Sequence, residues 1–169
     1  SKKLLTNHAK ANTVLLRGFS SLPDLPSMVD RYCLTQAAIA AYPMYRGLAS
    51  LVGMRVIPTG TEFAHEIETL AESFSQHDFF YIHYKPADAA GEDVDFSAKV
   101  KALEVLDGYL PELLEMNTDV FIVEGDHATP SVLASHSWHP VPFLICSKWT
   151  LGEGVEAFNE KDCGKGSIG

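Results

Sequence analysis

The sequence predicts an α/β fold with a mainly parallel sheet and helices on both faces. Short apolar runs alternate along the chain with segments of helical periodicity, and the connections between them are short. Such alternation is typical of parallel βαβ units, in which helices cover the sheet on both sides. With 169 residues, of which 46% are hydrophobic, the chain is expected to form a single domain over residues 1–169.

The first half of the chain predicts four strands and two helices. Residues 12–16 are β-branched and apolar, which predicts a strand that delivers Arg17 to its end. Residues 37–41 fit either a short strand or a helix; we favour a strand, because Pro43 can start the helix that follows and Gly53 can end it. Strands are therefore expected at residues 12–16, 37–41, 54–57 and 78–84, and helices at residues 43–53 and 64–75.

The second half predicts one long helix and two strands. From Asp95 to Leu113 apolar residues recur at intervals of three and four, and Pro111 is expected to kink or divide this helix. Apolar runs at residues 120–123 and 142–146 predict the last two strands, the first of them buried. The Gly-rich end of the chain and the early first strand suggest a piece of a longer protein.

The composition excludes some classes of function. The chain has 22 acidic residues against 13 lysines and arginines, a formal net charge of −9, whereas nucleic-acid binding needs a positive face. Three separated cysteines without Cys-x-x-Cys spacing favour a reduced intracellular protein. Since no stretch approaches the ~20 apolar residues of a membrane span and no signal peptide is evident, we expect a soluble, cytoplasmic protein.

The densest cluster of metal-type ligands directly follows the apolar run at residues 120–123. It contains Asp126, His127, His136 and His139, and α/β proteins build their sites where buried strands end. One of His136 and His139 is expected to be structural. In the alternative interpretation, Asp126 caps a short helix near Ser131 and His127 is exposed.

A second acidic segment follows the predicted strand at residues 78–84. Asp93 or Asp95 is expected to cap the long helix. Asp88 and Glu92 lie in the preceding turn, where metal ligation and plain solvation are equally consistent with the spacing. Paired ions held by Asp and His suit phosphoryl transfer; Arg17 and Arg46 could add forked donors to a phosphate or carboxylate.

These segments together resemble the archaeal type of cofactor-independent phosphoglycerate mutase, in the alkaline phosphatase superfamily. Residues 125–133 (Gly-Asp-His-Ala-Thr-Pro-Ser-Val-Leu) and 136–142 (His-Ser-Trp-His-Pro-Val-Pro) are similar to the family's C-terminal metal motif. Residues 85–95 resemble its Lys-x-x-Asp-x-Ala-Gly-His-Asp-Gly-Asp segment. The likeness spans nearly the whole chain and implies an incomplete alkaline-phosphatase-like domain, corresponding to the C-terminal portion of the enzyme.

The resemblance also implies roles for individual residues. Asp126 and His127 would bind one divalent ion, and Asp88, His136 and Glu92 the other. Glu92 replaces the usual histidine, which favours Mg²⁺ or Mn²⁺ over Zn²⁺. Arg17 and Arg46 are the candidates for substrate binding. Arg46 stands where such enzymes tend to carry a lysine.

The parent protein implied by this family interconverts 2-phosphoglycerate and 3-phosphoglycerate in glycolysis, through a phosphoserine and without bisphosphoglycerate as a cofactor. No segment of the chain matches the nucleophile motif, and neither Ser20 nor Ser21 is assigned that role. The chain alone is therefore expected to be inactive. Two alternatives remain: a related metal-dependent phosphatase or phosphonate-processing enzyme, and a non-catalytic relative whose Glu92 and Arg46 mark a lost active site.

Overall fold

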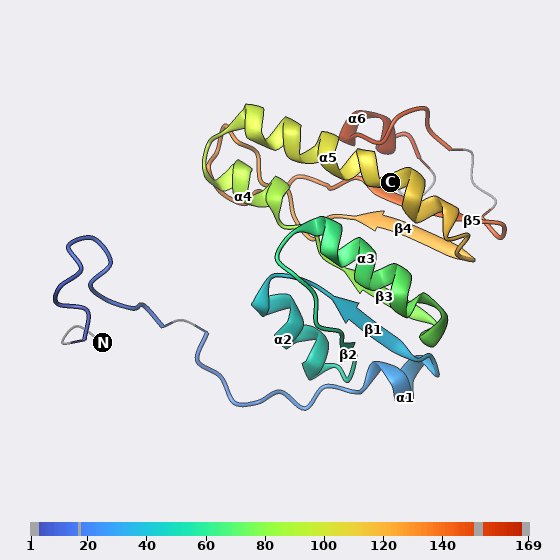
Figure 1. The fold of residues 1–169 in the computed structure, drawn as a ribbon. Helices are drawn as coiled ribbons and strands as arrows, with labels where there is room; N and C mark the ends of the chain where they lie inside the picture. Colours follow the sequence, from blue (N-terminus) through green and yellow to red (C-terminus); the bar gives the residue numbers. More distant parts are fainter. Residues whose placement is uncertain (1–3, 17, 151–153, 167–169) are drawn as a thin grey trace.

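A computed structural model describes residues 4–16, 18–150 and 154–166 (Figure 1). Its strands are β1 (Gln36–Ile39), β2 (Arg55–Val56), β3 (Phe79–Ile82), β4 (Val120–Glu124) and β5 (Phe143–Ser147). Its helices are α1 (Met28–Tyr32), α2 (Pro43–Leu51), α3 (Phe63–Ser73), α4 (Pro86–Glu92), α5 (Phe96–Glu115) and α6 (Glu160–Cys163), with a 3-10 turn η1 (Phe74–Gln76) after α3.

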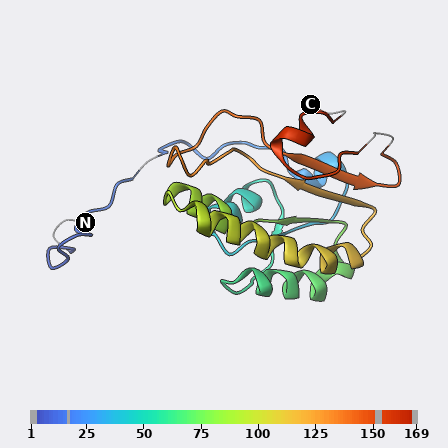
Figure 2. The ribbon, with the colours of Figure 1, turned by 90° about the horizontal axis from the view of Figure 1, so that it is seen from above.

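Three strands form a parallel sheet in the order β2-β1-β3. The chain moves from β1 to the neighbouring β2 and then back past β1 to β3. Because such crossovers are right-handed, α2 and α3 lie on opposite faces of the sheet, as the two views show (Figures 1 and 2). The predicted α/β class, with a parallel sheet and helices on both faces, is confirmed for this part of the chain.

The central strand explains why the core forms here. Residues 37–40 are fully buried, and the three alanines among them let α2 and α3 approach the sheet closely. On the α2 side, Ala38 packs with Ala49 and Met54. Pro43 begins α2, and Gly53 follows it with a φ of +81°, a left-handed conformation that suits glycine. Both helix-end predictions are thus confirmed.

Glu66 is a charged side chain inside this core, with 3% of its surface exposed. One carboxyl oxygen accepts a hydrogen bond from the Ala41 backbone N–H (2.8 Å), which ties α3 to the chain leaving β1. The other oxygen is buried without a partner among the described residues. Burial raises the pKa of Glu66 to about 7, with the Ala41 hydrogen bond acting in the opposite direction.

We expect Glu66→Gln to stabilise the protein above pH 7 but not near pH 4. The unfolded chain loses the Glu66 proton near pH 4.5, whereas the folded chain keeps it to about pH 7. The wild-type protein therefore loses stability as pH rises through this window, by about 3 kcal/mol, and the variant does not. Urea unfolding of both proteins at pH 4.5 and 8 measures this; exposed Glu68→Gln is the control, and a pH-independent difference would contradict the expectation.

The last two strands depart from the predicted single sheet. β4 and β5 pair with each other in antiparallel register, Val120 opposite Ser147 and Glu124 opposite Phe143, and form a separate two-stranded sheet. The prediction that residues 120–123 are buried is also wrong. Val120 and Ile122 remain 44% and 46% exposed, because an antiparallel pair covered on one side leaves alternate side chains open.

The predicted strand at residues 12–16 is not formed. These residues belong to an extended segment that runs away from the sheets (Figure 1), and Leu15 is 79% exposed. A β-branched, apolar run becomes a strand only beside a second strand that shares its backbone hydrogen bonds, and among the described residues none lies alongside. Arg17 itself lies outside the described residues.

The acidic segment after β3 is also more ordered than expected. Residues 86–92 form helix α4, not a turn, and Asp95 caps α5 by accepting a hydrogen bond from the Ala98 N–H (2.8 Å). Asp93 instead ends α4. Pro111 lies within α5 without dividing it. None of the helices in the described ranges is long and apolar enough to cross a membrane.

Candidate metal centre

Helix α4 presents two carboxylates on one side. Asp88 lies in its first turn and Glu92 is its last residue, and residues four apart on a helix are neighbours on one face. Lys85, immediately before the helix, pairs with Asp88 and lies 4.0 Å from a Glu92 oxygen. The helix therefore places the Asp88 and Glu92 carboxylates next to each other on one face.

The segment between β4 and β5 brings the histidines to this pair. Asp126 and His127 come directly after β4 ends at Glu124. The chain then folds back on itself through an isolated antiparallel bridge between Ala128 and Ser137, in which the Ser137 N–H donates to the Ala128 carbonyl (2.9 Å). This bridge places His136 beside His127, and their rings stack with centroids 3.8 Å apart.

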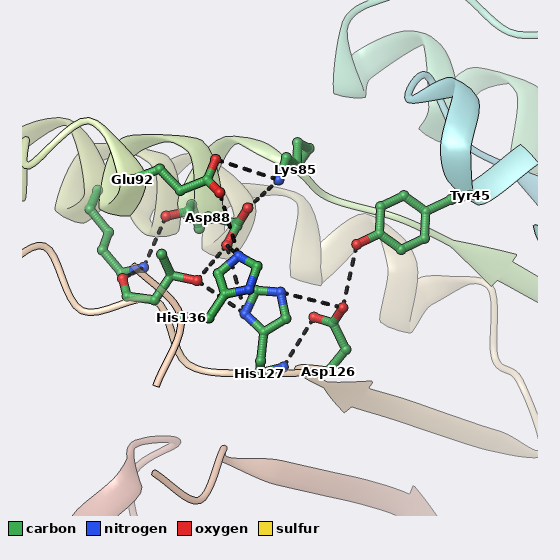
Figure 3. A network of polar contacts seen from close by, with 10 residues as sticks. Tyr45, Lys85, Asp88, Glu92, Asp126, His127 and His136 are labelled. Carbon is green, nitrogen blue, oxygen red and sulfur yellow. Dashed lines mark hydrogen bonds and ion pairs between the residues drawn. The ribbon is translucent and has the colours of Figure 1, made fainter. Parts of the chain in front are cut away.

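All five predicted metal-ligating side chains meet at one place (Figure 3). His136 Nε2 lies 3.4 Å from a Glu92 oxygen and 3.9 Å from Asp88 Oδ1, while His127 Nε2 lies 3.6 Å from Asp126 Oδ2. His127 Nδ1 lies 3.8 Å from Asp88 Oδ1. One ligand atom from each of Asp88, His127 and His136 lies within 4.8 Å of the others.

The donor set fits divalent ions. It combines three carboxylates with two imidazoles, in which oxygen ligands suit Mg²⁺ and Mn²⁺ and imidazole suits several transition metals. Burial raises the pKa of Asp88, but hydrogen bonds from Lys85 and Thr129 outweigh burial and hold that pKa below its ordinary value. Asp88 is therefore a carboxylate at neutral pH, as a metal ligand must be.

A scaffold of three further residues holds α4 against the histidine segment. Lys99 of α5 donates to two carbonyls, those of Ala87 in α4 and Thr129 after β4, each at 2.9 Å. The Thr129 hydroxyl donates to Asp88. Gly91 permits the close approach, because a Cβ at this position would lie 2.2 Å from the Thr129 carbonyl oxygen.

Tyr45 links the parallel sheet to the β4 side of the site. Its hydroxyl lies 3.4 Å from Asp126 Oδ2, and its ring stacks on His83 with centroids 3.4 Å apart. Burial and the nearby Asp126 charge raise the pKa of Tyr45, so it remains a protonated donor. Sequence reasoning missed Tyr45, Thr129 and Lys99, although Tyr45 directly precedes the predicted site residue Arg46.

The remaining predicted residues lie apart from the cluster. Arg46 is half-buried in α2, and no hydrogen bond or ion pair among the described residues joins it to the carboxylates or histidines. His139 is exposed, with Nδ1 2.8 Å from the Ser137 hydroxyl, whereas His136 lies within 4 Å of Asp88 and Glu92. The alternative in which Asp126 caps a helix near Ser131 is wrong, since turns occupy this stretch.

The fold and this Asp-His cluster are typical of α/β metalloenzymes. Residues 5–169 match the Metalloenzyme superfamily, and the chain belongs to it. Over 167 residues it is 50% identical to a Thermotoga maritima protein named "Probable 2,3-bisphosphoglycerate-independent phosphoglycerate mutase", covering 99% of this chain and 42% of that protein. An Aquifex aeolicus protein of the same name is 48% identical over 168 residues, again 99% of this chain but 41% of the relative.

Two solved structures share the fold. A Pyrococcus horikoshii protein superposes with a TM-score of 0.81 at 27% identity, covering 85% of this chain and 47% of the other. The cofactor-independent phosphoglycerate mutase from Thermoplasma acidophilum gives a TM-score of 0.63 at 23% identity, covering 86% of this chain and 35% of the other. At this identity the likeness shows the fold alone. The chain spans about two fifths of the curated relatives it matches.

Proposed function

We propose that this chain supplies the ligands of a two-ion centre in a 2,3-bisphosphoglycerate-independent phosphoglycerate mutase, within a single α/β domain that covers residues 1–169. The observation that carries the proposal is the convergence of Asp88 and Glu92 from α4 with Asp126, His127 and His136 from the β4-β5 segment. The 50% identity with proteins of that name supports the choice of reaction.

In this proposal Asp126 and His127 bind one ion, and Asp88, Glu92 and His136 bind the other. The ions would neutralise phosphate charge and favour ionisation of a serine hydroxyl during in-line phosphoryl transfer. Lys85 compensates the charge of Asp88 and Glu92, and Tyr45 orients the Asp126 carboxylate. Arg46 and Arg17 would hold the glycerate or phosphate, and the nucleophilic serine belongs to the parent protein outside this chain.

The preferred ion is proposed to be Mn²⁺ or Mg²⁺ over Zn²⁺. Three of the five ligands are carboxylates, and Glu92 gives the Asp88 and His136 site a second oxygen donor. The substrate would be phosphoglycerate, acted on in the cytoplasm. Binding titrations with the three ions, and cell fractionation for the compartment, test these finer points.

We expect the 169-residue chain to show no mutase turnover, whereas the parent protein should interconvert 2-phosphoglycerate and 3-phosphoglycerate. The reason is that the proposed mechanism needs a phosphorylated serine that the chain does not supply. A coupled assay of both proteins measures this. Turnover by the chain that is lost with chelator and with Asp126→Ala would contradict the expectation.

Product analysis with phosphoglycerate and metal analysis separate the alternative functions. A metal-dependent phosphatase would release inorganic phosphate from phosphoglycerate, and a mutase would not. A non-catalytic relative would hold no tightly bound divalent ions, so metal analysis of the parent protein separates it from both enzymes.

A further inference from the structure

Thr129 occupies a position between the two halves of the site. It lies three residues after Asp126 and is 4% exposed. Its hydroxyl contacts two proposed ligands at once, Asp88 Oδ1 and His127 Nδ1, the latter at 3.1 Å. Lys99 donates a hydrogen bond to the Thr129 backbone carbonyl. The backbone and the hydroxyl of Thr129 are therefore both held by neighbouring residues.

The hydroxyl has one hydrogen, and the two contacts compete for it. Asp88, as a carboxylate, can only accept a hydrogen bond, so the Thr129 hydrogen points to Asp88. The oxygen then presents only lone pairs to His127. The contact with His127 Nδ1 is favourable only if that nitrogen carries the ring proton, which leaves a lone pair on Nε2.

We propose that the Thr129 hydroxyl holds His127 in the tautomer protonated at Nδ1 and thereby reserves Nε2 for the ion bound by Asp126. This inference rests on the proposed two-ion centre. His127 Nε2 and Asp126 Oδ2 are two acceptors 3.6 Å apart, an arrangement that favours a shared cation. His127 Nδ1, although 3.8 Å from Asp88, cannot join the ion of Asp88 and His136 while it carries a proton.

Thr129 therefore decides how the ligands are divided. The distances alone allow His127 to join either ion, since Nδ1 lies 3.8 Å from Asp88 Oδ1 and Nε2 lies 3.6 Å from Asp126 Oδ2. With Nδ1 protonated, His127 serves the Asp126 ion. Thr129 acts through its neighbours and is a positioning residue.

Nitrogen NMR of the ¹⁵N-labelled chain without metal at pH 8 tests the proposal directly. In the wild type, the His127 ring should show a protonated Nδ1 and an unprotonated Nε2, with the signals assigned by their loss in His127→Gln. Thr129→Val, which keeps the shape but removes the hydroxyl, should move the proton to Nε2. Thr129→Ser should restore the wild-type pattern, and Thr35→Val, which breaks a remote Thr-Asp pair, should leave it unchanged.

Mn²⁺ titration gives a second readout. Thr129→Val should weaken binding about tenfold, and Thr129→Ser should bind nearly as the wild type does. A wild-type His127 protonated at Nε2, or a tautomer unchanged in Thr129→Val, overturns the inference. If Thr129→Val does not fold, Thr129→Ala, which also lacks the hydroxyl, takes its place, and a wild-type tautomer in that variant overturns the inference. Absence of Mn²⁺ binding with the expected tautomer refutes the two-ion centre but leaves the role of Thr129 in setting the tautomer intact.

Discussion

Gly91→Ala is expected to destabilise the chain by about 3 kcal/mol and to abolish metal binding at the cluster. The added Cβ would lie 2.2 Å from the Thr129 carbonyl oxygen and 3.1 Å from Lys99 Nζ. The first contact is with backbone, so no side-chain rotation relieves it, and α4 must move away from the β4-β5 segment. That movement breaks the Lys99 bridge and separates Asp88 and Glu92 from the two histidines.

Gly108→Ala is the matched control. Gly108 lies in α5, and a Cβ there would meet nothing within 4 Å, so the substitution should be neutral or slightly stabilising through helix propensity. Urea unfolding and Mn²⁺ titration of both variants measure the two effects. If Gly91→Ala behaves as Gly108→Ala does, the close approach of α4 to Thr129 is not what holds the cluster together.

The elements that sequence reasoning predicted well are those whose signals are local. The helical spacing of Ile67 and Leu70 and the position of Pro43 at the start of α2 depend on one segment at a time. The proposed ligands have a local signal too: adjacent Asp126 and His127 after an apolar run can be recognised as candidates without knowing what packs beside them. Such features need no information about the rest of the chain.

The predictions that differ from the structure concern segments whose structure depends on contacts with residues far away in the sequence. Residues 12–16 have the composition of a strand but no neighbouring strand among the described residues, and β4 pairs antiparallel with β5, a choice that the apolar pattern of each strand does not encode. The carboxylates of residues 86–92 predict a solvated turn, whereas the segment forms helix α4. Thr129 carries no sequence signal of its role, since its importance arises only from its contacts with Asp88 and His127.

The second large effect is expected from Asp88→Asn, which should weaken Mn²⁺ binding at least about 100-fold while leaving the chain folded. Asp88 is the carboxylate nearest the centre of the cluster, within 4 Å of both histidines. Asparagine keeps the shape and the oxygen that accepts from Thr129, but it removes the negative charge that a divalent ion needs. Loss of a direct ligand should exceed the 10 to 100-fold loss typical of residues that only orient ligands.

The gain in unfolding free energy on adding Mn²⁺ measures this difference in affinity. Wild-type protein at about 100 times its dissociation constant for Mn²⁺ should gain about 2.7 kcal/mol against unfolding, and Asp88→Asn should gain almost nothing at the same Mn²⁺ concentration. Asp93→Asn makes the same substitution at the exposed end of α4 and should respond to Mn²⁺ as the wild type does. An equal response from all three proteins would mean that the ion binds elsewhere, and the convergence of α4 with the histidine segment would then have a purely structural purpose.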